Sequence, residues 1–318
     1  MSALMPWLLS GLGLVILLLA GDALVKGAVN LSLRLGVPAL IVSLTIVAFG
    51  TSAPELLIAI KAIMQDAPGL ALGNVVGSNT ANILMVLGIP AMLAVMHTSE
   101  CDSKKNYNYM IAATLLFIAL AFRGVFDWIA GVILLGGLAA ILTSAFFEAR
   151  AHRRNGQDAE DEDVEGADPD LPGWRIAIFL VLGILGLPLG ADLLVDNASI
   201  IARAYGVSDT VIGLTLVAVG TSLPELATTV MAALRRQADV ALGNVIGSNM
   251  FNLLAIIGIA SLVGPIPVDQ AFLQFDLWVM LAASILIVPF VYMGRDITRT
   301  WGILLTLLYA AYVTLVLT

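Results

Sequence analysis

The chain contains the same sequence twice, at a fixed spacing. GTSAPEL at 50–56 recurs as GTSLPEL at 220–226, and ALGNVVGSNTAN at 71–82 recurs as ALGNVIGSNMFN at 241–252, both at an offset of 170 residues. Without any gap at this offset, the segments 20–88 and 190–258 are identical at roughly 28 of 69 positions. The fold must therefore contain two equivalent units.

Composition indicates where these units lie. Of the 318 residues, 60% are hydrophobic and 12% are charged, against about 25% charged in an ordinary soluble domain. The apolar residues form successive stretches of about 20 residues, which is long enough to cross about 30 Å of hydrocarbon. We predict an all-α polytopic membrane protein with ten transmembrane helices, at 5–34, 38–65, 70–97, 106–123, 125–148, 173–204, 208–235, 238–263, 271–291 and 297–317.

The ten helices divide into two halves. Residues 1–150 form the first five-helix repeat half, 151–172 an acidic linker, and 173–318 the second five-helix repeat half. Because five is odd, the second half enters the membrane from the opposite side, which gives inverted-topology repeats. With both termini outside, most Lys and Arg of the loops lie in the cytoplasm with the linker, as the positive-inside rule favours. The compact loops and the absence of a targeting signal favour a bacterial plasma membrane, the inner membrane.

Charge and cysteine content exclude several classes of protein. The net charge of −8 says little about function, because eight acidic residues fall between Asp158 and Asp170. This composition excludes a nucleic-acid binder. Cys101 is the single cysteine, so neither an intramolecular disulfide nor a zinc site is expected. No cofactor and no obligatory protein partner is evident, and the lipid bilayer is the expected environment.

The acids that lie deepest in the apolar stretches are Glu55 and Glu225, at equivalent positions of the two repeats. A carboxylate within the membrane costs roughly 2.5–3.5 kcal/mol on insertion scales unless it faces a cavity or a cation. In an inverted repeat, equivalent mid-helix positions approach the pseudo-two-fold axis. We therefore expect both carboxylates to face one central site.

The residues before each glutamate favour a cation site built from oxygen. Pro54 and Pro224 cannot donate helical hydrogen bonds, so each helix should kink or break at its Gly-Thr-Ser step and free backbone carbonyls. Ser52 and Ser222 precede the glutamates by three residues and share their helix faces. Many oxygens with two carboxylates suit Ca²⁺ better than Mg²⁺, which demands a tighter octahedron and sheds water reluctantly.

The second motif contributes neutral polar residues at a spacing of four, which places them on one helix face. They are Asn74, Ser78 and Asn82, repeated as Asn244, Ser248 and Asn252. They are candidate cation ligands, and the alternative is that they join helices by hydrogen bonds. The glycines of this motif form small-xxx-small patterns that let helices approach closely: Gly73 and Gly77, and Gly243 and Gly247.

With GTSAPE and GTSLPE, and GNVVGSNTAN and GNVIGSNMFN, the chain resembles the sodium/calcium exchangers of the cation/calcium antiporter superfamily. The resemblance covers both repeat cores and extends to the ten-helix layout. It implies that Glu55 and Glu225 bind Ca²⁺ and share in Na⁺ coordination, and that Asn82 and Asn252 line the central site. It further implies that the remaining ligands, for Na⁺ above all, are Ser52, Ser78, Ser222 and Ser248, with the backbone carbonyls of Thr51, Thr221, Ala48 and Ala218.

In one respect the chain departs from this family. Many members have Asp at one of the two positions that Asn82 and Asn252 occupy, so the centre here is less anionic. This argues against the branch that cotransports K⁺ with an Asp at the second position. Ser52 and Ser222 argue for Na⁺ coupling, because the H⁺-coupled branch tends to lack the serine before Pro-Glu. The resemblance thus implies a secondary antiporter that extrudes Ca²⁺ at the expense of the Na⁺ gradient, with H⁺-coupled cation antiport as the alternative.

Two other functional classes compete with antiport. An intramembrane enzyme finds little support, since no Gly-x-Ser-x-Gly, His-Glu-x-x-His or phosphate-binding loop is present. A gated cation channel is a nearer rival. Uphill flux driven by a second ion gradient would exclude the channel.

Overall fold

The structure is a computed structural model that describes residues 4–154, 168, 170–206 and 218–317. It is predominantly helical, with one two-stranded β ladder among the described residues. In the first half the elements are α1 (Met5–Leu35), α2 (Ala39–Val42), the π-helix η1 (Ser43–Val47), α3 (Ala48–Thr51), α4 (Ala53–Met64), α5 (Pro68–Ala81), the π-helix η2 (Asn82–Val86), α6 (Gly88–Leu93), the 3₁₀-helix η3 (Thr98–Glu100), α7 (Lys104–Ala121), β1 (Val125–Phe126) and α8 (Trp128–Arg154).

The second half again begins with a long helix and continues to a helix that contains a π-helical turn, but the elements after that helix differ from those of the first half. Its elements are α9 (Gly173–Ala204), α11 (Ala218–Gly220), α12 (Leu223–Leu234), α13 (Ala238–Met250), the π-helix η5 (Phe251–Ile256), α14 (Ile257–Val263), β2 (Ile266–Pro267), α15 (Gln270–Gln274), α16 (Asp276–Leu286), α17 (Val288–Tyr292) and α18 (Arg299–Leu317). The predicted span 208–235 begins with residues that lie outside the described ones. α8 continues to Arg154, which is four residues into the predicted linker.

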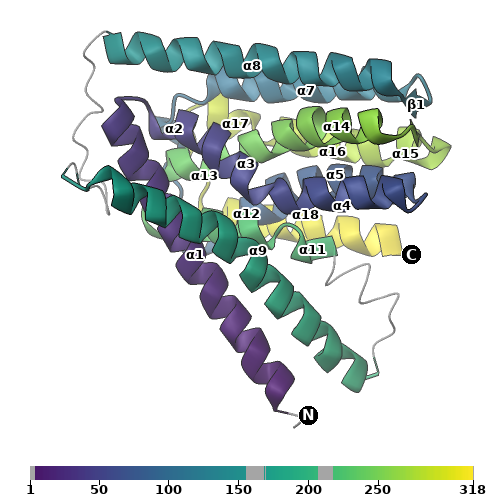
Figure 1. Cartoon of the computed structure of the whole chain (residues 1–318), viewed down its shortest axis with the longest axis horizontal. Coiled ribbons are helices and arrows are strands. Elements are labelled where there is room, and N and C mark those ends of the chain that lie inside the picture. The colour runs from purple at the N-terminus through teal and green to yellow at the C-terminus, as the bar shows by residue number, and fades with distance from the viewer. Residues whose placement is uncertain (1–3, 155–167, 169, 207–217, 318) are drawn as a thin grey trace.

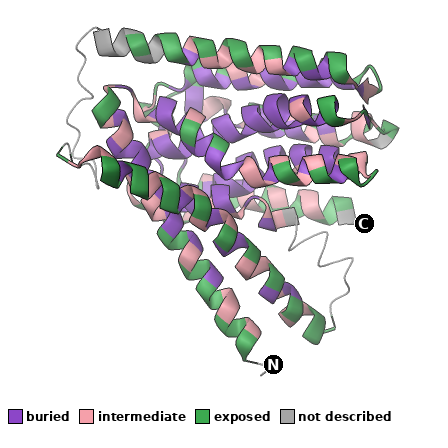
Figure 2. Cartoon of the chain, in the orientation of Figure 1, coloured by how far each residue is buried: buried purple, intermediate pink, exposed green. Residues whose placement is uncertain are grey.

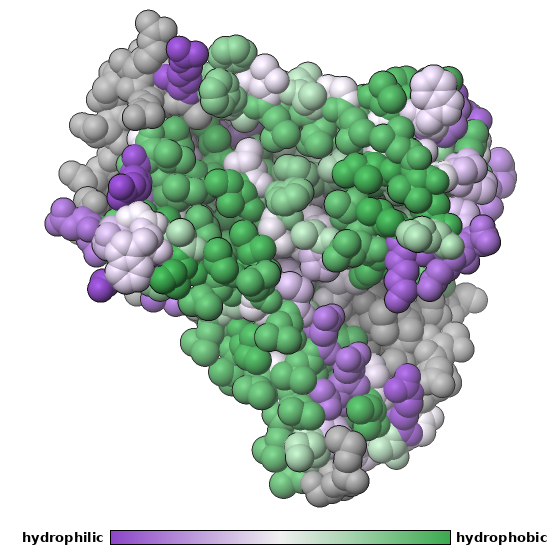
Figure 3. Space-filling model, viewed as in Figure 1, coloured by the Kyte–Doolittle hydropathy of each residue, from purple (hydrophilic) through white to green (hydrophobic). Residues whose placement is uncertain are grey.

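Length and hydropathy support a membrane protein. Among the described residues, seven helices are long and apolar enough to cross a membrane, and the pair Ala39–Thr51 and Ala53–Met64 adds an eighth if it is one broken span. α12 is a shorter apolar helix. The exact number of ten crossings therefore stays a prediction. Figure 3 shows hydrophobic side chains between the two ends of the bundle and hydrophilic side chains gathered at its left and right ends.

The repeat motifs form the centre of the bundle. The spans Pro68–Leu93 and Ala238–Val263 have 83% and 89% of their most apolar windows buried, against 33% for α1 and 22% for each of α8 and α9. In Figure 2 the buried segments accordingly lie inside a shell of helices with exposed outer faces. The exposed residues of that shell are largely Leu, Ile, Val and Phe, which is what contact with lipid requires.

α1 and α9 lie side by side and cross the rest of the bundle obliquely (Figure 1). Glycines allow this contact: a Cβ on Gly13 would lie 2.6 Å from the backbone nitrogen of Leu194, and a Cβ on Gly183 would lie 2.5 Å from the Cβ of Leu24. The two helices therefore pack backbone against backbone, as small residues permit in membranes. They are the equivalent first helices of the two repeats.

Candidate cation site

The two Gly-Thr-Ser-x-Pro-Glu segments break their helices as the prolines predict. The axis bends by 42° between Ala39–Thr51 and Ala53–Met64. Ser52 has non-helical dihedral angles and precedes the first turn of α4, and Ser222 stands in the same way before α12. Both glutamates thus lie in the first turn of a helix rather than at mid-helix. A helix N-terminus carries partial positive charge, which stabilises a nearby carboxylate.

The carboxylates of Glu55 and Glu225 lie together in the protein interior. Each residue is 1% exposed, and the two carboxylates interact electrostatically. The hydroxyl of Ser52 donates to Oε1 of Glu225 across the repeat interface, at 3.2 Å. The structure therefore brings the two glutamates together in the interior, as the sequence predicts.

Two threonine–asparagine hydrogen bonds join the repeats in a symmetric way. Thr51 Oγ1 donates to Oδ1 of Asn244 at 3.3 Å, and Thr221 Oγ1 donates to Oδ1 of Asn74 at 3.4 Å. The sequence led us to expect a role only for the backbone carbonyls of these threonines, but their hydroxyls also join the two repeats. These bonds join helices of the two repeats, which is the alternative role predicted for Asn74 and Asn244.

The two halves differ around these bonds because their sequences differ. The amide of Asn244 also donates to Oγ1 of Thr229 at 3.1 Å and to the carbonyl of Glu225 at 3.3 Å. The first repeat has Ala59 at the position of Thr229, and Nδ2 of Asn74 is buried without a hydrogen-bond partner in the described chain. Hydrogen bonding is therefore denser around Glu225 than around Glu55.

Four buried carboxylate and amide oxygens at the centre lack a hydrogen-bond partner among the described residues, in two equivalent pairs. They are Oε2 of Glu55, Oε2 of Glu225, Oδ1 of Asn82 and Oδ1 of Asn252. An oxygen buried without a donor is costly, because it loses its hydrogen bonds to water. Coordination to a cation would offset the lost hydration of all four atoms. Carboxylate and amide oxygens are the ligands that Ca²⁺ prefers.

The other predicted ligands lie around these four. Ser222 Oγ is also buried without a partner, whereas Ser248 shares a hydrogen bond of 3.4 Å with Thr51. Ser78 and Ser248 are 5% and 0% exposed. The carbonyl of Ala48 accepts from Thr51 Oγ1 at 3.3 Å and from the backbone N–H of Ser52 at 3.0 Å. In the second repeat the backbone N–H of Ser222 donates to the carbonyl of Val219 at 3.0 Å.

A second buried pair, Asn79 and Asn249, was not singled out from the sequence. Asn79 donates to the carbonyl of Asn249 at 3.1 Å, which joins α5 to α13. A signal was present, because the pair is identical in both copies of GSNxxN. The sequence predicts no role for Asn79 or Asn249, because neither residue lies on the four-residue spacing that the other polar positions share.

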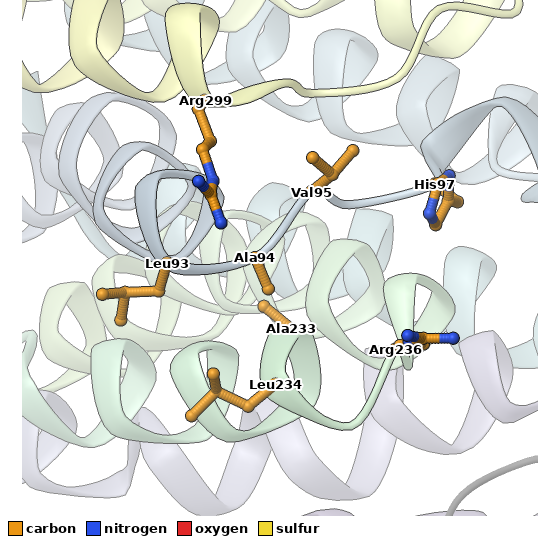
Figure 4. A pocket seen from close by; sticks show the side chains of 8 residues that line it. All are labelled: Leu93, Ala94, Val95, His97, Ala233, Leu234, Arg236 and Arg299. Carbon is orange, nitrogen blue, oxygen red and sulfur yellow. The ribbon is translucent and has the colours of Figure 1, made fainter.

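A cavity of about 440 Å³ lies elsewhere, at one end of the bundle. Its lining includes Leu93 and Ala94 at the end of α6, Leu234 and Arg236 at the end of α12, and Arg299 at the start of α18. Figure 4 shows the Arg299 side chain directed into this space. Its charged lining is cationic, so it does not suit the cations expected at the glutamates.

Comparison with known proteins shows the family of this chain. The family model described as sodium/calcium exchanger protein matches residues 5–147 and 175–318. The chain belongs to the sodium/calcium exchanger family. It is 36% identical over 304 residues to the putative antiporter CaxA of Alkalimonas amylolytica, covering 94% of this chain and 95% of that protein. It is 35% identical to the sodium/calcium exchanger MaX1 of Methanosarcina acetivorans, with 95% of each chain covered.

Solved structures of the same family have the same fold. The sodium-calcium exchanger NCX_Mj soaked with 2.5 mM Na⁺ and 1 mM Sr²⁺ superposes with a TM-score of 0.80 at 33% identity, covering 99% of each chain. The same exchanger soaked without Na⁺ and Ca²⁺ gives a TM-score of 0.81 at 32% identity, covering 98% of this chain and 99% of that one. The chain is therefore an integral membrane transporter of a family whose substrates are Ca²⁺ and Na⁺, and not an enzyme.

Proposed function

We propose that this exchanger transports Ca²⁺ out of the cell in exchange for Na⁺, by alternating access to the site between α4 and α12. The observation that carries this proposal is the symmetric set of four buried oxygens, on Glu55, Glu225, Asn82 and Asn252, that have no hydrogen-bond partner among the residues the structure describes. Two carboxylates balance the charge of one Ca²⁺, and the two amides complete an oxygen cage. Ser52, Ser78, Ser222 and Ser248, with the carbonyls of Thr51, Thr221, Ala48 and Ala218, complete the Na⁺ sites.

Shared ligands account for the coupling. If one Ca²⁺ or several Na⁺ occupy the same two carboxylates, the ions compete and cannot be carried together. Moving empty carboxylates through a closed interior costs several kcal/mol. The transporter therefore changes its open side only when the carboxylates are neutralised, which makes entry of one ion depend on exit of the other.

The movement is assigned to the pair α1 and α9. This pair lies outside the buried centre and crosses it obliquely (Figure 1), and α1 and α9 both contact α12. Sliding of the pair would expose the site to either side while the central helices stay in place. In the proposed orientation the termini are outside and the linker 151–172 is cytoplasmic, in a bacterial inner membrane.

Na⁺ coupling is favoured over H⁺ coupling by the hydroxyls. Ser52 Oγ lies against Glu225, and Ser222 Oγ is buried without a partner in the described chain. A proton would need only the carboxylates, whereas Na⁺ needs further oxygens such as these hydroxyls. The H⁺-coupled antiporter remains the second candidate, and the experiment below separates the two.

The test is uptake of radioactive Ca²⁺ into proteoliposomes loaded with Na⁺ and diluted into Na⁺-free buffer. Vesicles loaded with K⁺, and vesicles with an acidic interior, run in parallel. We expect uphill uptake only with internal Na⁺. Uptake driven by the proton gradient alone would replace this proposal with H⁺ coupling, and uptake that only follows the Ca²⁺ gradient would indicate a channel.

Glu55→Gln and Glu225→Gln test the site itself. Each should reduce uphill uptake by at least about 100-fold, since one charge then remains to balance a divalent ion that requires two. The matched control is Asp66→Asn, which removes an exposed carboxylate in the turn after α4. Asp66 has a φ of 56°, which Asn tolerates. Unchanged uptake in either glutamine variant would remove that carboxylate from the proposed site.

A further inference from the structure

Asn79 and Asn249 form a reciprocal link between α5 and α13. They are equivalent in the two repeats and are 2% and 1% exposed. Nδ2 of Asn79 donates to the backbone carbonyl of Asn249 at 3.1 Å, and Nδ2 of Asn249 approaches the carbonyl of Asn79 at 3.5 Å. Each amide therefore turns its nitrogen to the opposite backbone, which leaves its oxygen directed elsewhere.

Those two oxygens accept hydrogen bonds from the proposed ligands. Asn82 Nδ2 donates to Oδ1 of Asn249 at 3.0 Å, and Asn252 Nδ2 donates to Oδ1 of Asn79 at 2.9 Å. Each bond again crosses between the repeats. The four amides thus form one symmetric cluster in which every oxygen of the inner pair, Asn79 and Asn249, is used.

The consequence falls on the outer pair. An amide carries its oxygen and its NH₂ on opposite sides, so fixing the NH₂ group fixes where the oxygen points. The NH₂ groups of Asn82 and Asn252 both donate to the inner pair, and their Oδ1 atoms are buried with no hydrogen-bond partner in the described part of the chain. Turning either amide over would aim an N–H donor at the cation and place two oxygens against each other.

We propose that Asn79 and Asn249 are positioning residues that hold the amide oxygens of Asn82 and Asn252 toward the transported cation. This inference rests on the proposed function, because it takes the central oxygens as the Ca²⁺ ligands. It also gives a physical reason for the two neutral residues at the centre of this exchanger. A carboxylate at position 82 or 252 has no N–H to give to the inner amides unless it is protonated.

The test is a double-mutant cycle on the Ca²⁺ dependence of Na⁺-driven uptake. Asn79→Leu removes the acceptor for Asn252 and should raise the KM for Ca²⁺ about tenfold, with the maximal rate changed less than about twofold. In the Asn252→Ala background the same substitution should change KM by less than about twofold, because the amide that it positions is gone. Asn249→Leu with Asn82→Ala is the equivalent cycle in the other repeat.

A further variant separates positioning from packing. Thr80→Val is the matched control: Thr80 is fully buried on the same helix, and its hydroxyl donates to the carbonyl of Val76 in its own helix. If Asn79→Leu raises KM equally with and without Asn252, or leaves KM unchanged, the positioning role is wrong.

Calorimetric titration of the purified protein with CaCl₂ measures Ca²⁺ binding directly and does not require transport. The positioning role predicts the same tenfold weakening of Ca²⁺ binding in Asn79→Leu, and the same loss of the effect in the Asn252→Ala background. Should wild type show no Na⁺-driven uptake, the proposed exchange fails, but this cycle still tests the amide cluster. If a leucine variant does not fold, Asn79→Ala takes its place in the cycle.

Discussion

At the scale of single residues, the two repeats are alike in their glutamates and unlike in their serines. Ser52 Oγ donates to Oε1 of Glu225, whereas Ser222 Oγ is buried with no partner among the described residues. If both hydroxyls bind Na⁺, both matter for Na⁺ affinity. The Ser52 hydroxyl alone also orients a carboxylate that Ca²⁺ requires.

Ser52→Ala and Ser222→Ala test this difference. Each should raise the Na⁺ concentration for half-maximal exchange about threefold to tenfold, the range expected for one lost oxygen contact. Ser52→Ala should in addition raise the KM for Ca²⁺, since Glu225 loses one of its hydroxyl donors, while Ser222→Ala leaves that KM within about twofold. The measurement is Ca²⁺ uptake at varied internal Na⁺ and varied external Ca²⁺. Equal Ca²⁺ KM values in the two variants would contradict the asymmetry.

Sequence predicts which residues meet at the centre but not how each is hydrogen-bonded. The repeat and the buried charge were sufficient to bring Glu55 and Glu225 together, because a membrane interior tolerates few alternatives. The direction of an amide was not predictable. Whether Asn74 turns its oxygen to Thr221, or Asn82 turns its oxygen to the cation, depends on partners 147 or 167 residues away.

At the scale of helices, the central elements approach so closely that side chains are excluded. A Cβ on Gly247 would lie 2.5 Å from the carbonyl oxygen of Leu44 and 2.6 Å from the Cβ of Ala48, and a Cβ on Gly243 would lie 2.8 Å from the carbonyl of Leu40. This confirms the predicted close packing for the second repeat. At Gly73 and Gly77 no described atom lies within 4 Å of such a Cβ, so the equivalent contact stays a prediction.

Gly247→Ala should therefore push α13 away from η1 and α3. We expect a loss of about 1–3 kcal/mol of stability, the usual cost of overpacking, seen as a lower apparent melting temperature in detergent. Gly136→Ala is the control, because Gly136 is exposed on α8 with no atom near its Cβ position. That variant should keep or slightly raise the melting temperature, since Ala favours helix. Equal melting temperatures in both variants would show that α13 has room to move.

Some helix irregularities can be predicted from the sequence and others cannot. Pro54 predicts the break before Glu55, but no residue type in the sequence marks the π-helical turns at 43–47, 82–86 and 251–256. A π-turn arises where tertiary contacts outweigh the regular hydrogen-bond ladder, and such turns concentrate at functional sites. Here η2 and η5 begin at or beside the proposed ligands Asn82 and Asn252.

At the scale of the whole molecule, the halves are interlocked at both ends of the bundle. At one end β1 pairs with β2, with Phe126 opposite Ile266. At the other end Met96 and Ile297 exchange backbone hydrogen bonds of 3.1 Å. Met96 and Ile266 are equivalent in the repeats, so the pseudo-symmetry extends to the connecting loops. These loops give no periodic signal, and only the assembled fold brings them together.

The Met96–Ile297 end carries an additional polar clamp on Asp296. Its Oδ1 accepts from the Ser99 hydroxyl at 2.6 Å and from the Ser99 backbone at 3.1 Å, and its Oδ2 lies 2.9 Å from Nδ1 of His97. Partial burial alone would raise the pKa of Asp296, but the hydrogen bonds from Ser99 and His97 outweigh it and hold the pKa below its ordinary value. The ionised carboxylate therefore stabilises the contact between the halves.

Asp296→Asn should lower the free energy of unfolding by about 1 kcal/mol at pH 7, the typical worth of such hydrogen bonds at a partly exposed site. Because the folded pKa lies below the unfolded one, this contribution is complete above the unfolded pKa, near 3.8. It is lost as the pH falls through the folded pKa, since both states then carry a proton. Urea unfolding of wild type and variant between pH 7 and pH 3 should give a difference that shrinks only below about pH 4. The exposed Asp66→Asn variant should leave the free energy of unfolding at pH 7 unchanged. If the gap for Asp296→Asn does not shrink at all between pH 5 and pH 3, shape rather than charge holds this end together.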